Sequence, residues 1–240
     1  MTQVPRATLL EQLATVASEA PAGYVPLQAT PYRGHHLLAE ALLDRIPDSA
    51  TVFEAGVSSG YFARVLTSNG HTVDGFDIDP EMAKTARSVC REVWVGDLGR
   101  VDVDELLEDG AYDAVVFGDT LEHLPDPAAV LAALRPKLRP GGWLVVSVPN
   151  VANWAIRLQL LAGRFTYRDR GILDRTHLRF YTRRSLVDLI ASSGYTVDSV
   201  TPSVPVPGLH GERGCRLAHR VGTLVPGLFA YTFIVAAQRS

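Results

Sequence analysis

The chain has 240 residues, of which 47% are hydrophobic and 20% are charged, and its formal net charge is −3. This length can bury one sizeable core in a single domain, and the weak, dispersed charge leaves no basic face for DNA or RNA, so we expect no nucleic-acid partner. No apolar run of about 20 residues occurs, so we expect no membrane span. The two cysteines lie far apart without a metal-type spacing and the N-terminus has no signal-peptide pattern, so a cytoplasmic location is the simplest assignment.

Apolar residues recur at helical spacing in residues 7–19 and again in residues 34–46, ahead of the first predicted strand. Prolines interrupt the pattern between these two helices. We interpret residues 1–47 as helices that pack on the flank of a sheet or form a lid over a ligand pocket. Four side chains at the start of the second helix would suit a lid, although a solvated helix start explains them equally well: Tyr32, Arg33, His35 and His36.

The run from Thr51 to Leu66 combines a short apolar strand, an acid at its end, a small-residue turn and an amphipathic helix. Gly56 and Gly60 can adopt positive φ and let a ligand approach the backbone, and the following helix offers unpaired N–H groups. The pattern predicts a loop that cradles a nucleotide-like ligand around Glu54. A purely structural turn is the alternative.

Two further strands end in carboxylates. Asp77 ends the strand predicted at residues 71–78, about 20 residues beyond the glycine loop, where an acid can accept hydrogen bonds from ribose hydroxyls. Asp79, directly before a proline, already serves as a helix cap, which leaves Asp77 for the ligand. Asp97 ends the strand predicted at residues 93–98 and could accept from an adenine amino group, a solvated turn being the alternative.

Strands and helices continue to alternate along the rest of the chain, which predicts an α/β fold with a doubly wound parallel sheet that binds ligands at the carboxyl ends of its strands. Residues 149–182 and 201–230 interrupt this alternation and are predicted to form substrate-side insertions. The remaining predicted elements are strands at 112–117, 143–148, 195–200 and 231–237, and helices at 127–138, 184–193 and 215–225.

Residues 45–200 resemble the class I S-adenosylmethionine-dependent methyltransferases, in particular the small-molecule branch that includes ubiquinone-pathway O-methyltransferases. Ser58 stands where the middle glycine of the family's first loop usually stands, which affects the local backbone shape. The motifs that carry the resemblance, in chain order, are Glu54-Ala55-Gly56-Val57-Ser58-Ser59-Gly60, Gly75-Phe76-Asp77-Ile78-Asp79-Pro80-Glu81-Met82, Gly96-Asp97-Leu98, Leu121-Glu122-His123 and Pro140-Gly141-Gly142.

The resemblance implies a Rossmann-like sheet of seven strands in the order 3-2-1-4-5-7-6 with strand 7 antiparallel. It implies S-adenosylmethionine as cofactor and S-adenosylhomocysteine as product. Residues 171–182 also resemble a subgroup that modifies sugars, glycans or natural products, so we expect a small-molecule acceptor. The implied cofactor contacts are Glu54 near the methionine amino group, Gly56 and Gly60 at the methionine and ribose, Asp77 at the ribose, Ile78, Asp97 and Leu98 at the adenine, and Gly118 and Thr120 below the sulfonium.

Methyl transfer from a sulfonium is an in-line displacement, in which alignment and exclusion of water matter most and a base is optional. If the acceptor is a hydroxyl, His177 is the first candidate base and His123 the second, although both could be structural. A divalent metal site would require Asp119, Glu122, His123 or His177 to converge, which their order in the sequence does not establish, so we assign no metal ligand.

Other readings remain open from the residues. They are N- or C-methylation by the same fold, a cofactor-binding protein without catalysis, and an NAD-dependent oxidoreductase. The last is disfavoured because the loop lacks the Gly-x-Gly-x-x-Gly spacing and because Glu54 would repel a pyrophosphate. The oligomeric state, a homodimer included, is not encoded in any pattern of the sequence.

Overall fold

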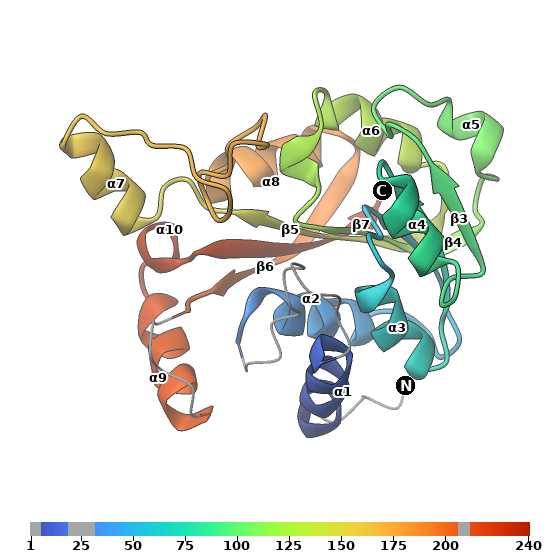
Figure 1. Cartoon of the computed structure of the whole chain (residues 1–240), viewed down its shortest axis with the longest axis horizontal. Helices are drawn as coiled ribbons and strands as arrows, with labels where there is room; N and C mark the ends of the chain where they lie inside the picture. Colours follow the sequence, from blue (N-terminus) through green and yellow to red (C-terminus); the bar gives the residue numbers. More distant parts are fainter. Residues whose placement is uncertain (1–5, 19–31, 206–211) are drawn as a thin grey trace.

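The computed structural model describes residues 6–18, 32–205 and 212–240, in which seven strands form one sheet with helices on both faces (Figure 1). The strand order is β3-β2-β1-β4-β5-β7-β6, and β7 runs antiparallel to β5 and β6. This confirms the predicted Rossmann-like fold. The strands are β1 (Thr51–Ala55), β2 (Thr72–Asp77), β3 (Glu92–Val95), β4 (Tyr112–Gly118), β5 (Leu138–Pro149), β6 (Tyr195–Ser203) and β7 (Thr232–Arg239).

Both faces of the sheet are covered, which explains why the central strands β1, β4 and β7 are buried on both sides without alternation. Val52 of β1 points into the core beneath one helical layer, and its neighbour Phe53 points into the core beneath the other. The first layer holds α1 (Arg6–Ser18), α2 (Gly34–Leu43), α3 (Tyr61–Ser68) and α4 (Pro80–Ala86), and the second holds α5 (Val103–Leu106), α6 (Pro127–Leu134) and α8 (Arg183–Ser192).

Local sequence fixes where several helices begin. The Asp79 carboxylate accepts hydrogen bonds from the N–H groups of Glu81 and Met82 at the start of α4, as predicted for a residue before proline. Asp126 caps α6 in the same way. These caps orient the helices that follow β2 and β4, so the polar residues at the ends of those strands face a common edge of the sheet.

The structure differs from the predicted elements in the segment before the fifth strand. Residues 139–142 were expected to form a turn, whereas they belong to β5, whose register with β4 is irregular near Tyr112. Gly141 has φ of +74°, and a side chain at Gly142 would meet the Arg139 carbonyl at 2.9 Å. The two glycines therefore let the strand bulge and continue instead of ending it.

Further elements gather at the end of the sheet where β5 finishes (Figure 1). Sequence patterns did not predict α7 (Trp154–Leu161), α10 (Pro226–Phe229) or the short helix η1 (Leu121–His123), whereas α9 (Glu212–Gly222) overlaps the helix predicted at 215–225. Residues 1–5 and 19–31 of the expected lid, and 206–211 of the second insertion, lie outside the described residues. None of the described helices is long and apolar enough to cross a membrane.

Candidate active site

A cavity of about 430 Å³ opens at the carboxyl ends of β1, β2 and β3. The register of the parallel strands creates it, because the N–H groups of Gly56 and Val57 donate to the Phe76 carbonyl at 2.8 and 3.0 Å, and the Gly96 N–H donates to the Asp77 carbonyl at 2.9 Å. Six of the nine predicted cofactor residues line this cavity, namely Gly56, Asp77, Ile78, Asp97, Leu98 and Thr120.

The Asp77 carboxylate organises the glycine loop. Its Oδ2 accepts a hydrogen bond from the Ser58 N–H at 2.6 Å, and its Oδ1 accepts one from the Asp79 N–H at 2.9 Å. Ser58 has φ of +52°, so a serine adopts the left-handed conformation that the family's middle glycine would take. The expectation that Asp77 is left entirely to the ligand is therefore corrected, although each oxygen keeps a second lone pair for a ribose hydroxyl.

Ile78 and Asp97 lie on the same cavity. The Ile78 side chain is 70% exposed and lines the cavity, so it offers an apolar surface that suits a flat ring such as adenine. Asp97 accepts from the Gly99 N–H at 3.0 Å and forms an ion pair with Arg100 at 3.1 Å. Phe76, Gly96 and Leu124 also line the wall; Phe76 and Gly96 lie within the quoted motifs but were not assigned a contact, and Leu124 gave no signal in the sequence.

Three predicted cofactor residues lie off this cavity. Glu54 is buried under the loop, and among the described residues its Oε2 has no hydrogen-bond partner. Burial, and then the charge of Asp77, raise the pKa of Glu54 well above its ordinary value. Gly60 has φ of +79° and packs against Ala86, whose Cα would lie 3.1 Å from an added Cβ, while Gly118 lines a second cavity.

The second cavity, of about 510 Å³, adjoins the first and shares His123 with it; we call it the reaction chamber. The fold brings His123 and His177 together although 54 residues separate them in the sequence, with ring centroids 4.9 Å apart. The chamber also holds His35 and Tyr61, whose rings meet edge to face at 5.7 Å. His35 was an expected lid residue, whereas His36 is fully buried and faces Glu40 in α2.

Backbone carbonyls hold both candidate bases. Nδ1 of His123 lies 3.1 Å from the Thr176 carbonyl, and Nδ1 of His177 lies 3.2 Å from the Ile172 carbonyl. A carbonyl only accepts, so each Nδ1 carries a hydrogen, and in the neutral form of either ring the lone pair lies on Nε2. Nε2 of His177 faces Glu122 Oε1 at 3.8 Å, whereas no hydrogen bond within the described residues engages Nε2 of His123.

Glu122 is buried beside His177, and neither of its carboxylate oxygens has a hydrogen-bond partner among the described residues. Burial, and then the charge of Asp119, raise the pKa of Glu122 well above its ordinary value. Burial, and then the charge of His123, lower the pKa of His177, which favours a neutral imidazole that can accept a proton.

Three of the four residues considered for a metal site converge. The potential ligand atoms of Glu122, His123 and His177 lie within 4.8 Å of one another. Asp119 is not part of this cluster, and its Oδ1 accepts a hydrogen bond from the Ser147 hydroxyl at 2.8 Å.

Comparison with known proteins decides the family. A model of the family described as methyltransferase domain matches residues 29–200. The chain belongs to this family. The membership confirms the resemblance to class I S-adenosylmethionine-dependent methyltransferases that the ordered motifs had indicated, and with it the expected cofactor.

Relatives of this methyltransferase domain are named ubiquinone biosynthesis O-methyltransferase. The protein of Xylella fastidiosa is 32% identical over 146 residues, which cover 58% of this chain and 59% of that protein. The protein of Xanthomonas campestris is 31% identical over 168 residues, which cover 67% of this chain and 69% of that protein. The chain thus spans less than two thirds of the first of these relatives.

Solved structures share the fold at lower sequence identity. A methyltransferase of Archaeoglobus fulgidus superimposes with a TM-score of 0.60 at 18% identity and covers 85% of this chain and 94% of its own. A methyltransferase of Mesorhizobium loti gives a TM-score of 0.55 at 19% identity and covers 83% and 96%. Likeness at this level supports the fold and carries no information about the acceptor.

Proposed function

We propose that this methyltransferase domain transfers a methyl group from S-adenosylmethionine to a hydroxyl of a small molecule such as a sugar or natural product. The observation that carries this proposal is the position of His123. Its ring stands in the wall shared by the cofactor cavity and the reaction chamber, and its Nδ1 is held by the Thr176 carbonyl, so that in the neutral ring Nε2 would be the accepting atom. A hydroxyl bound beside it would lose its proton as it attacks.

The cofactor cavity fits S-adenosylmethionine. Asp77 would accept from the ribose hydroxyls, exposed Ile78 would cover one face of the adenine, and Asp97 would accept from its amino group. Bound in this way, the cofactor supplies a methyl group activated by a sulfonium. Thr120 lines the cavity at the boundary with Gly56, where it would border the methionine portion.

His177 lies next to His123 in the reaction chamber and would be the other candidate base. Its imidazole packs edge to face on the His123 ring, and its Nε2 faces buried Glu122. Either ring would take the acceptor's proton at its own Nε2, because each Nδ1 is bonded to a backbone carbonyl. The relatives named O-methyltransferases support a hydroxyl as the accepting group.

Within the proposed single domain, residues 1–47 would act as a lid, residues 48–148 as the cofactor-binding core, and residues 149–182 and 201–230 as the acceptor side. His35 supports the lid assignment because it reaches the reaction chamber from α2. Tyr231, directly after the second insertion, lines the same chamber.

The proposal is tested in two stages. Calorimetry first compares S-adenosylhomocysteine with NAD, and binding of the former alone is expected. Transfer of a labelled methyl group to a panel of hydroxylated sugars and phenols follows. We expect His123→Gln and His177→Gln to lower turnover by about 100-fold while S-adenosylhomocysteine affinity stays within about twofold. Methylation confined to amines or carbons, or cofactor binding without transfer to any acceptor, would contradict the proposed O-methylation.

A further inference from the structure

A third cavity, of about 300 Å³, adjoins the reaction chamber on the side away from the cofactor; we call it the outer cavity. The two share Arg170, Gly171 and Tyr231 in their walls. Gly171 is necessary at this junction, because an added Cβ would lie 2.7 Å from the Tyr231 hydroxyl. The shared residues make the two cavities neighbours, so an acceptor that occupied both would pass beside Tyr231. The outer cavity is at the lower end of the size range of small-molecule sites.

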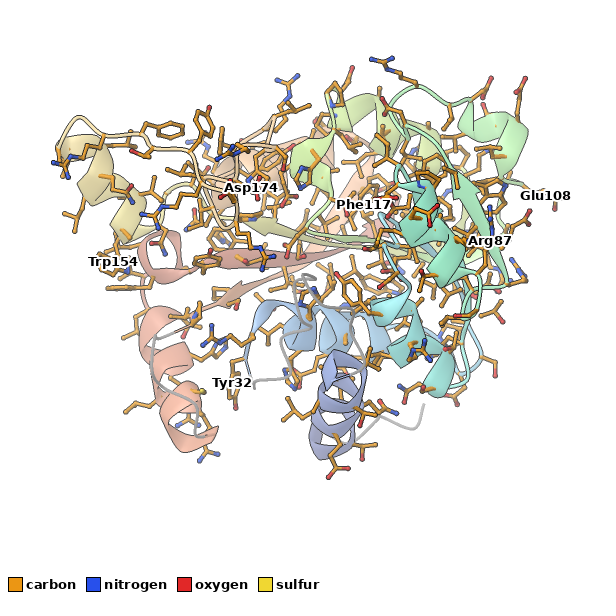
Figure 2. The ribbon with its side chains drawn as sticks, viewed as in Figure 1. Tyr32, Arg87, Glu108, Phe117, Trp154 and Asp174 are labelled. Atoms are coloured by element: carbon orange, nitrogen blue, oxygen red, sulfur yellow. The ribbon has the colours of Figure 1, made fainter. Side chains whose placement is uncertain are left out.

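Much of the wall of the outer cavity is apolar and aromatic. Trp154 is 50% exposed, and Phe229 and Tyr231 are 38% and 37% exposed, so three large rings present surface that the protein core does not use. Figure 2 shows Trp154 at the end of the molecule formed by α7 and α10, and Asp174 in the loop between α7 and α8. Exposed rings around a cavity indicate a ligand with an apolar or flat body.

The charged side chains that line the outer cavity are all positive. Arg168 and Arg170 line the outer cavity, and its lining includes no carboxylate. Within the described residues Arg168 has no hydrogen bond or ion pair through its guanidinium. The neighbouring acids have other partners, since Asp169 pairs with Arg175 at 2.6 Å and Asp174 accepts from Thr176 at 2.8 Å.

The segment around Arg168 also carries an excess of positive charge. Residues 154–179 carry six arginines and two aspartates, although the whole chain has a net charge of −3. A local positive potential on an otherwise acidic protein attracts anions, and a guanidinium can bind a carboxylate or phosphate with two parallel hydrogen bonds.

We infer that the acceptor carries an anionic group on an apolar or ring-shaped body, and that Arg168 binds this group in the outer cavity while the hydroxyl to be methylated lies beside His123. This inference rests on the proposed methyl transfer and adds the class of acceptor. Arg168 is then a specificity-determining residue, and Tyr231 borders the acceptor where the two cavities meet.

The test uses matched pairs of probes that differ only in charge. Protocatechuate and its primary amide represent a ring-shaped natural product, glucuronate and glucuronamide represent a sugar acid, and glucose phosphate and glucose represent a phosphate. Each is titrated by calorimetry into protein saturated with S-adenosylhomocysteine. We expect the charged member of at least one pair to bind at least about tenfold tighter, and the pair that responds distinguishes a carboxylate from a phosphate.

Two variants locate the effect. Arg168→Gln should weaken the charged probe by about tenfold and remove its advantage over the neutral partner. Arg164→Gln removes the same charge from the same exposed loop at a position that does not line the cavity, and it should change affinity by less than about twofold. Both variants should keep the melting temperature, because neither substitution changes the backbone hydrogen bonds of the loop.

The inference is overturned if no charged probe is preferred, or if Arg164→Gln weakens binding as much as Arg168→Gln, since the charge would then act only at long range. Failure of the wild-type protein to bind S-adenosylhomocysteine is a different result, because it overturns the proposed function itself. Cofactor binding with no charge preference overturns only the anionic acceptor.

Discussion

Replacing Asp77 by alanine is expected to affect cofactor affinity and folding by separate amounts. The carboxylate accepts from the N–H groups of Ser58 and Asp79, and in the proposed complex it also accepts from two ribose hydroxyls. Because Asp77 is half-buried, water can replace part of what the two N–H groups lose. Each lost bond then costs about 1 kcal/mol, so the free energy of unfolding should fall by about 2 kcal/mol.

The loss of affinity should be larger. Hydrogen bonds to a charged acceptor contribute about 1.5–3 kcal/mol each, so losing both ribose contacts should weaken S-adenosylhomocysteine by at least about 100-fold. Calorimetry measures the affinity, and urea unfolding followed by circular dichroism measures the stability. A folded protein that no longer binds at usable concentrations is the expected result.

Asp79→Ala is the matched control. Asp79 lies two residues away, is exposed and caps α4, so its loss should cost about 1 kcal/mol of stability without changing S-adenosylhomocysteine affinity. If both variants bind S-adenosylhomocysteine as tightly as the wild type, Asp77 does not contact the ribose and the cofactor assignment fails.

Three further outcomes are expected. The pKa of Glu54 in the folded protein lies above its ordinary value of 4.5, so as pH rises this carboxyl ionises first in the unfolded chain, and the free energy of unfolding falls from about pH 4.5 upward. Glu54→Gln should therefore raise the melting temperature at pH 8 and leave it unchanged at pH 4. An equal shift at both pH values would contradict this. Gly56→Ala should destabilise the fold by about 1–3 kcal/mol more than Gly110→Ala. Both glycines have positive φ, but only at Gly56 would the new Cβ lie 2.4 Å from Thr120 Oγ1. Equal melting temperatures of the two variants would show that this contact relaxes. Turnover should survive EDTA if the histidines act as bases, whereas loss of turnover that magnesium restores would show that Glu122 and the two histidines hold a divalent cation.

The cofactor side of the molecule could largely be predicted from local sequence. Strand, turn and helix follow one another at fixed spacing around Gly56, Asp77 and Asp97, and parallel strands place their carboxyl ends at one edge. Each of these residues stands at or just after the end of a strand, so spacing contains most of the information about its position. The exceptions are Glu54 and Gly60, which lie off the cofactor cavity in or beneath the loop, and Gly118, which lines the reaction chamber. The order of residues in a sequence does not distinguish a residue that supports the loop from one that contacts the ligand.

The acceptor side could not be predicted in this way. Residues 149–182 have no clear period in the sequence, and Figure 1 shows that α7, α9 and α10 gather at the end of the sheet where β5 finishes.

The sequence by itself therefore determined the alternation of strands and helices and the ligand edge of the sheet, because hydrophobic periodicity and glycine geometry are local properties. Its ordered motifs indicated the family, and the order of the strands followed only from that resemblance. Only the tertiary structure decided that His123 meets His177, 54 positions along the chain, that Asp77 also holds Ser58, and that Arg168 borders a cavity whose described lining has no carboxylate. Those relations join segments far apart in the chain, and burial and long-range packing create them.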